Sequence, residues 1–173
     1  MKTSNIRDVL SLGFLNRRET LIISGGINSD MNALARALGM KAGAEGTSVM
    51  TINAGMLHEE LAAGAEGRLS AVKLVELAKP ELLIVEDFGM KKFAPSQTKV
   101  LAHLVTERIN RSSTIITSGY PLAKWAPLVG GSAEGKRLLR SLSIHARQVV
   151  IGSKEQTAKK KPAPVEVTVQ AHS

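Results

Sequence analysis

Short aliphatic runs alternate along this chain with longer stretches in which apolar positions recur every three to four residues. Such runs predict strands that are buried on both faces, and the longer stretches predict amphipathic helices. The expected strands are residues 20–24, 47–52, 82–85, 114–118 and 148–151, and the expected helices are residues 31–44, 56–63, 68–78, a stretch from 95 onward, and 133–145. This alternation is typical of a three-layer α/β fold with a five-stranded, mainly parallel sheet.

The two ends of the chain differ from this alternating part. Residues 1–19 carry apolar positions at helical spacing, and we expect an N-terminal helical lead-in that packs on a domain formed by residues 20–151. From residue 152 onward the chain is polar and contains Lys159-Lys160-Lys161. We expect residues 152–173 to form a basic, disordered tail.

One strand runs directly into two carboxylates, since Leu82-Leu83-Ile84-Val85 is followed by Glu86-Asp87. In an open α/β sheet ligands bind at the carboxyl ends of the strands, where an acidic pair can reach a phosphate-bound metal ion. The alternative is a solvated strand end. A second feature favours the functional interpretation, because the segment 25–32 places a glycine loop between a strand and a helix, as in phosphate-binding loops.

Composition narrows the function classes. The 173 residues include no cysteine, which excludes disulfides and thiolate metal sites, and no apolar run approaches the ~20 residues that span a bilayer. We expect a cytoplasmic protein without membrane contact. The net charge of +8 and the aromatic fraction of 3% favour sequence-independent contact with duplex DNA over base stacking. The candidate DNA-binding residues, each of which is alternatively a solvated surface charge, are Lys91, Lys92, Arg108, Arg111, Lys159, Lys160 and Lys161.

Together these segments resemble the ATPase domain of the IstB family, AAA+ helpers of insertion-sequence transposition that are related to the DnaC helicase loaders. The resemblance covers about residues 10–151. It rests on Gly67-Arg68-Leu69, on the run from Ala78 to Gly89, on Glu107-Arg108 followed by 113–118, and on Pro121 through Trp125. It implies a P-loop NTPase-type fold, ATP and Mg²⁺ as cofactors, and DNA, a transposase and further copies of the chain as partners. The family's separate N-terminal domain has no expected counterpart in this sequence.

The phosphate loop departs from the family pattern G-x-x-x-x-G-K-[ST]. By resemblance the cofactor-binding positions are Gly25, Gly26, Ser29, Asp30, Met31 and Asn32. Asp30, Met31 and Asn32 stand where the family has its second glycine, its lysine and its magnesium-binding hydroxyl. A carboxylate ~4 Å from a phosphate charge repels it by roughly 4 kcal/mol at an effective dielectric of about 20. This repulsion alone corresponds to about a thousandfold in affinity.

The expected catalytic positions differ from the family pattern to different degrees. Glu86 and Asp87 keep the family's acidic pair, in which the first residue holds magnesium and the second orients water. Ser118 precedes the position of the asparagine that senses the γ-phosphate, now Gly119, and Arg140 lies one residue, or about 100° of helix rotation, from the arginine finger. We therefore expect a pseudo-ATPase that acts as a DNA-associated or assembly subunit. Two alternatives remain, a DNA-dependent ATPase completed by residues from another position or subunit, and a truncated, non-functional relic.

Overall fold

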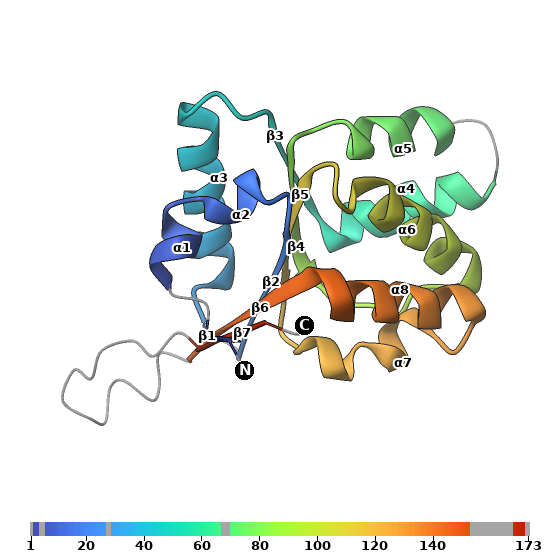
Figure 1. Ribbon diagram of the computed structural model, residues 1–173. Coiled ribbons are helices and arrows are strands. Elements are labelled where there is room, and N and C mark those ends of the chain that lie inside the picture. Colours follow the sequence, from blue (N-terminus) through green and yellow to red (C-terminus); the bar gives the residue numbers. More distant parts are fainter. Residues whose placement is uncertain (1, 4–5, 27–28, 67–69, 153–167, 172–173) are drawn as a thin grey trace.

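The computed structural model describes residues 2–3, 6–26, 29–66, 70–152 and 168–171. Figure 1 shows a sheet seen nearly edge-on between two layers of helices. The strands are β1 (Lys2–Thr3), β2 (Thr20–Gly25), β3 (Val49–Asn53), β4 (Leu82–Phe88), β5 (Ser113–Ser118), β6 (Ala146–Ile151) and β7 (Thr168–Ala171). The helices are α1 (Ile6–Leu10), α2 (Gly13–Asn16), α3 (Met31–Ala44), α4 (Ala54–Ala65), α5 (Ser70–Ala78), α6 (Pro95–Arg108), the 3₁₀ turn η1 (Leu122–Lys124), α7 (Ala126–Val129) and α8 (Ala133–His145). The three-layer α/β prediction is confirmed.

The strand order in the described sheet is β1-β7-β6-β2-β5-β4-β3. The five strands β6, β2, β5, β4 and β3 pair in parallel, as predicted. The short strands β7 and β1 extend the sheet in antiparallel fashion beyond β6. The prediction of an unpacked tail is therefore wrong for residues 168–171, whereas residues 153–167, with Lys159, Lys160 and Lys161, lie outside the described part.

Each face of the sheet has its own hydrophobic core. Helices α1, α2 and α3 cover one face, and α4, α5, α6 and α8 cover the other (Figure 1). On the first face, Val9, Leu12 and Phe14 are buried against the sheet, so the N-terminal lead-in belongs to the core. It forms two short helices, and Leu12 between them adopts a left-handed backbone with φ of 62°.

Helix α3 approaches the sheet closely because of a glycine. Ala35, Leu38 and Ala42 form its buried stripe, at helical spacing. Within that stripe, a Cβ added at Gly39 would lie 2.7 Å from Cδ1 of Ile84 in β4. The small residue brings α3 against the centre of the sheet, and this contact fixes the side chains that the first turns of α3 present to β4.

Arg108, a predicted DNA contact, is buried at the end of α6. Only 2% of the residue is exposed, and its guanidinium donates hydrogen bonds to the carbonyl oxygens of Leu77, Ala78, Pro80 and Ser113 and to Oγ1 of Thr114. Burial lowers the pKa of Arg108 to about 10. The prediction for Arg108 is wrong, because its donors are used to join the segment before β4 to the start of β5.

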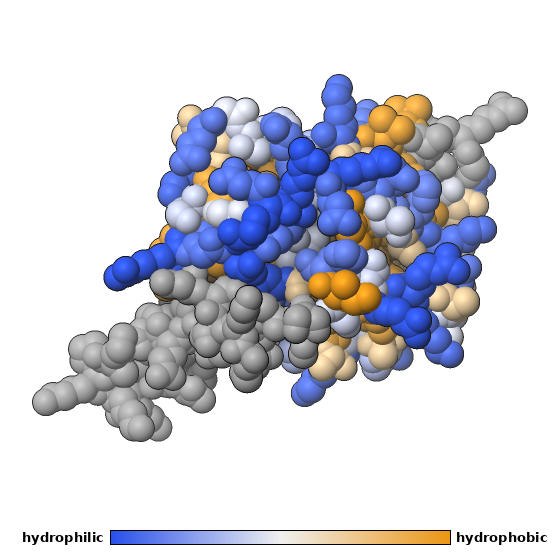
Figure 2. Space-filling model, viewed as in Figure 1, coloured by the Kyte–Doolittle hydropathy of each residue, from blue (hydrophilic) through white to orange (hydrophobic). Residues whose placement is uncertain are grey.

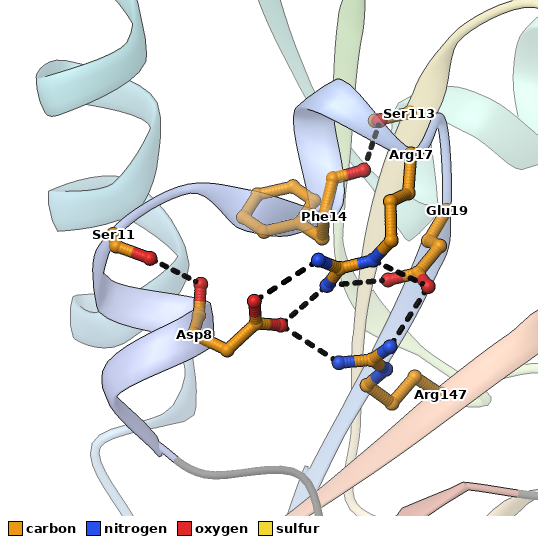
Figure 3. Close-up of polar contacts among 7 residues, drawn as sticks. All are labelled: Asp8, Ser11, Phe14, Arg17, Glu19, Ser113 and Arg147. Atoms are coloured by element: carbon orange, nitrogen blue, oxygen red, sulfur yellow. Dashed lines mark hydrogen bonds and ion pairs between the residues drawn. The ribbon is translucent and has the colours of Figure 1, made fainter.

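A ring of alternating charges ties the N-terminal segment to β6 (Figure 3). Arg17 bonds to the carboxylates of Asp8 and Glu19. Arg147 donates to the same two carboxylates, at 2.8 Å to each. The hydrogen bond from Arg17 is the main cause that lowers the pKa of Asp8, and the nearby charges of Arg17 and Arg147 add to it against the opposing effect of burial.

The ring generates a prediction about stability and pH. Because the pKa of Asp8 is lowered below its model value of 3.8 on folding, its carboxylate stabilises the folded state above that pH, and this contribution is lost as the pH falls through the lowered pKa. Asp8→Asn should lower the melting temperature by about 2–4 °C near neutral pH, an effect expected for a partly exposed network worth about 1 kcal/mol.

Thermal unfolding followed by circular dichroism measures this difference. The gap between Asp8→Asn and the wild type should narrow in high salt, and it should shrink progressively as the pH falls from 3.8 through the lowered pKa of Asp8. Glu59→Gln, at an exposed position on α4, is the control and should leave the melting temperature unchanged. A gap that stays constant over this pH range would contradict the assigned role of the ring.

Candidate functional site

The candidate site lies where β2, β4 and β5 end, next to the first turn of α3. A cavity of about 500 Å³ opens there. Its lining comes from the glycine loop, the start of α3 and the segments after β4 and β5, and consists of Gly26, Ser29, Met31, Asn32, Asp87, Phe88, Gly89, Met90, Gly119 and Tyr120. Five predicted site residues therefore share one cavity, namely Gly26, Ser29, Met31, Asn32 and Asp87.

Three side chains at the bottom of this cavity form a closed set of hydrogen bonds. Asn32 donates from Nδ2 to Oδ1 of Asp87 at 2.9 Å. The hydroxyl of Thr117 donates to Oδ1 of Asn32 at 2.6 Å and accepts the backbone N–H of Asp87 at 2.9 Å. Asp87 itself has a left-handed backbone with φ of 59°. The amide at the magnesium-ligand position thus joins α3 to the ends of β4 and β5.

The other carboxylate of the acidic pair is bound by an arginine. Arg36 donates from Nε and Nη2 to the two carboxylate oxygens of Glu86, at 2.6 and 2.7 Å. The Glu86 side chain is only 7% exposed, whereas that of Arg36 is 63% exposed. The hydrogen bond to Glu86 is the main cause that raises the pKa of Arg36. A buried carboxylate needs such a partner, and a bidentate guanidinium supplies charge and geometry together.

The glycine loop requires a glycine at its first position. A Cβ at Gly25 would lie 2.5 Å from Oγ of Ser29 and 3.0 Å from the carbonyl oxygen of Ile151, so the loop closes tightly only on a glycine. The Ser29 hydroxyl is buried and has no hydrogen-bond partner in the described part of the chain. Ile27 and Asn28 lie outside the described residues.

These groups do not fit a magnesium-bound nucleotide. Ser29 offers one unused hydroxyl, but Met31 carries no positive charge for the β- and γ-phosphates. Asn32 and Arg36 already hold the two carboxylates that would otherwise approach a metal ion. Magnesium binds carboxylate oxygens, but both oxygens of Glu86 accept hydrogen bonds from Arg36, whose positive charge also repels the ion.

Ser118 occupies a different place from the one predicted. It is fully buried, and its hydroxyl donates to the carbonyl oxygen of Phe88 at 2.7 Å and accepts the backbone N–H of Tyr120 at 3.1 Å. This corrects the prediction that Ser118 serves as a catalytic sensor. The hydroxyl that reaches the site is Thr117, one residue earlier.

The remaining predicted residues lie on the surface. Lys91 and Lys92 are exposed just after the cavity segment that follows β4, and Asp30 is exposed at the start of α3. Arg111 forms an ion pair with Glu107 on α6, at 2.9 Å. None of these four residues is among those that line the cavity, although Lys91 and Lys92 directly follow the lining residue Met90.

The sequence interpretation missed Arg36 and Thr117. Arg36 follows Asn32 by four residues, which places both on one face of α3, and that spacing beside an acidic strand end was the available signal. Thr117 had no such signal. Which of Thr117 and Ser118 faces the site depends on the register of β5 beside β4, and this pairing shifts between Val85 and Phe88.

The chain is similar to ATP-binding proteins of insertion sequences. The family model described as "IstB-like ATP binding protein" matches residues 1–163. The putative ATP-binding protein of insertion sequence IS5376 from Geobacillus stearothermophilus is 31% identical over 142 residues, which are 82% of this chain and 56% of that protein. The putative ATP-binding protein Rv3427c from Mycobacterium tuberculosis is 25% identical over 158 residues, 91% of this chain and 63% of the relative.

Solved structures support the fold. DnaI has a TM-score of 0.72 at 16% identity, covering 84% of this chain and 81% of DnaI. The DnaC helicase loader has a TM-score of 0.66 at 19% identity, covering 87% of this chain and 93% of DnaC. The chain spans 56 to 65% of the length of the first curated relatives it matches. Since the family model covers nearly the whole sequence, the chain belongs to the IstB-like ATP-binding proteins of insertion sequences.

Proposed function

We propose that this chain is a pseudo-ATPase of the IstB family, a subunit that helps to assemble a transposition complex without hydrolysing ATP. The observation that supports the proposal is the pairing of both acidic side chains with protein groups, Asp87 with Asn32 and Glu86 with Arg36. In an ATPase the corresponding carboxylates serve a metal ion and a water molecule. In this chain both carboxylates accept hydrogen bonds from side chains of α3.

The scaffold retains what an assembly role requires. The two cores and the parallel strands are formed by the protein alone, and the end of β4 is fixed by Asn32 and Arg36. A subunit of this kind can present a constant surface to a transposase, a class of partner that follows from its insertion-sequence relatives. Its conformation would not depend on a nucleotide cycle.

Contact with DNA is a second proposed element, favoured by the net charge of +8. Three consecutive lysines, Lys159, Lys160 and Lys161, concentrate charge within a short segment. Such a cluster binds phosphates through counterion release, without sequence preference. Arg111 remains a weaker candidate because Glu107 neutralises it, and the buried Arg108 is excluded.

Nucleotide binding provides the first test. Calorimetric titration with magnesium and ATP should give a dissociation constant of about 1 mM or weaker, because the loop lacks its cation and carries Asp30. No hydrolysis should be detected. Turnover that disappears in Glu86→Gln/Asp87→Asn would contradict the pseudo-ATPase assignment and favour the completed-enzyme alternative.

A variant that restores the family's loop residues tests whether the charge of the loop causes the weak ATP binding. Asp30→Gly/Met31→Lys/Asn32→Thr restores the family's loop residues and should improve ATP affinity by at least about tenfold, since it removes one repulsive charge and adds one attractive charge. Hydrolysis should still be absent while Arg36 holds Glu86. Unchanged affinity in this folded variant would mean that loop shape, and not loop charge, excludes the phosphates.

The Arg36–Glu86 pair generates a prediction of its own. Arg36→Met leaves the buried Glu86 carboxylate without its guanidinium, so the melting temperature should fall by a few degrees. Adding Glu86→Gln should recover part of the loss, because the unpaired charge is then removed. Magnesium should stabilise Arg36→Met and leave the wild type unaffected. Arg111→Met, at an exposed ion pair, is the control. Strictly additive effects of the two substitutions would contradict the coupling.

DNA contact is measured by the salt dependence of binding to a labelled duplex. Lys159→Gln/Lys160→Gln/Lys161→Gln should reduce the slope of log affinity against log salt by roughly two to three units, about one for each lost phosphate contact. Substitutions, unlike a deletion, preserve strand β7. The control replaces three exposed lysines of the folded part, Lys79, Lys99 and Lys136, by glutamine and should leave the slope unchanged. An unchanged slope in the tail variant would place the DNA elsewhere.

A further inference from the structure

Two hollows adjoin at Tyr120 on the surface where the parallel strands end. The first is the candidate-site cavity of about 500 Å³. The second, of about 450 Å³, is lined by Tyr120, Ala123, Lys124, Pro127 and Leu128. A Cβ at Gly89 would lie 2.9 Å from Leu128 and 3.4 Å from Tyr120, so the segment after β4 packs directly against η1 and α7. The two hollows thus form one surface.

This surface exposes large apolar side chains. Met90 is 80% exposed and Tyr120 is 49% exposed. Single exposed hydrophobic residues are ordinary, but apolar side chains that flank adjoining hollows are typical of binding sites. The view in Figure 2 is largely hydrophilic, with another hydrophobic area over α5, where Val72 and Val75 are exposed. Lys73 on α5 forms ion pairs with Glu60 and Glu76, so these charged residues beside the α5 area do not indicate a partner of one charge.

One lysine lines the paired hollows, and two more directly follow a lining residue in the chain. Lys91 and Lys92 follow Met90 directly, and Lys124 lines the second hollow. All three are exposed, and none belongs to an ion pair found among the described residues. The first turn of α3, with the positive end of its dipole, also lines the first hollow. Two carboxylates lie at the first hollow: Asp87, which lines it and is bonded to Asn32, and Asp30, which is exposed at the start of α3. Contacts with a ligand therefore use the lysines and the apolar lining, and the acidic residues of a ligand are expected to avoid the start of α3.

We propose that this surface binds an acidic peptide segment of a partner protein. One large apolar side chain enters each hollow, and the segment's carboxylates contact Lys91, Lys92 and Lys124. The inference rests on the proposed function, because the first hollow lies beside the glycine loop, where an ATPase of this family would hold phosphates. A duplex backbone explains the lysines alone, whereas an acidic peptide with apolar anchors explains the lysines and both hollows.

The probes are fluorescein-labelled peptides of about 12 residues that contain two phenylalanines, spaced by two to four residues, among glutamate, aspartate and serine. Fluorescence anisotropy with the full chain should give dissociation constants on the order of 10–100 μM for the best spacing. Replacing both phenylalanines by serine should abolish binding. The same peptide with lysine in place of each acidic residue should not bind either.

Protein variants locate the site. Met90→Ser/Tyr120→Ser and, separately, Lys91→Glu/Lys92→Glu/Lys124→Glu should each weaken binding at least about tenfold. The matched controls are Met40→Ser, at a methionine that is 77% exposed on α3, and Lys79→Glu/Lys99→Glu/Lys136→Glu. Both should keep the affinity within about twofold of the wild type. Unfolding curves should show that every variant is folded.

Three results would overturn the proposal. Equal binding of the serine peptide would show a purely electrostatic surface. Displacement of the peptide by a duplex of about 20 base pairs, with the same variants weakening that duplex, would assign the surface to DNA. If no peptide bound at any spacing of its two phenylalanines, the docking proposal would be wrong and the pseudo-ATPase proposal would be unaffected. If magnesium and ATP displaced the peptide, that result would contradict the pseudo-ATPase proposal and would confirm that the peptide occupies this surface.

Discussion

The structure depends on the compensation of two carboxylates at the end of strand β4. Negative charge placed side by side at a strand end needs partners, and a nucleotide site obtains them from a metal ion and its surroundings. In this chain the partners come from one helix. Asn32 bonds to Asp87, and Arg36, one turn later, holds Glu86 in a bidentate pair. The compensation is therefore internal and permanent.

This arrangement complements a second tie at the opposite edge of the sheet. Arg108 joins the residues before β4 to the start of β5, and the hydrogen bond from the backbone N–H of Asp87 to the hydroxyl of Thr117 joins the ends of the same two strands. Both ends of this strand pair are thus fixed by polar contacts, while the aliphatic middle packs into the two cores. The charge ring around Arg147 performs a similar task for β6 and the N-terminal helices.

Local patterns predicted the elements of this fold well. The helix expected at residues 31–44 has those bounds, and all five parallel strands were found within a few residues of their expected positions. Trp125, at the end of a segment that carries the family resemblance, is fully buried. These features follow from periodicity and from glycine and proline positions, which are local.

Properties that depend on distant partners were not predictable from the same patterns. Nothing adjacent to Arg108 shows that five acceptors converge on it, and nothing near Thr168 shows that β6 has a free edge. The choice between Thr117 and Ser118 depends on a pairing shift beside Phe88. The loss of the loop lysine was visible in sequence, but its compensation by Arg36 requires the close approach of α3 to β4 that Gly39 permits.

The hydrogen bonds of Asn32 and Arg36 also bear on the two alternatives, an ATPase completed by another position or subunit and a truncated, non-functional relic. A neighbouring subunit that supplied a lysine would add one cation, yet Glu86 would still have to leave two short hydrogen bonds from Arg36 before serving a metal ion. The enzyme alternative thus needs two changes at one site. In a relic, substitutions at a buried polar site would tend to leave unpaired groups, which are costly. At this strand end Asn32, Arg36, Glu86, Asp87 and Thr117 are all paired, and the buried hydroxyl at this cavity that has no partner among the described residues, that of Ser29, lies in the glycine loop. We infer that the changes at this site are mutually adapted, which favours a folded protein in a new role over a decaying ATPase.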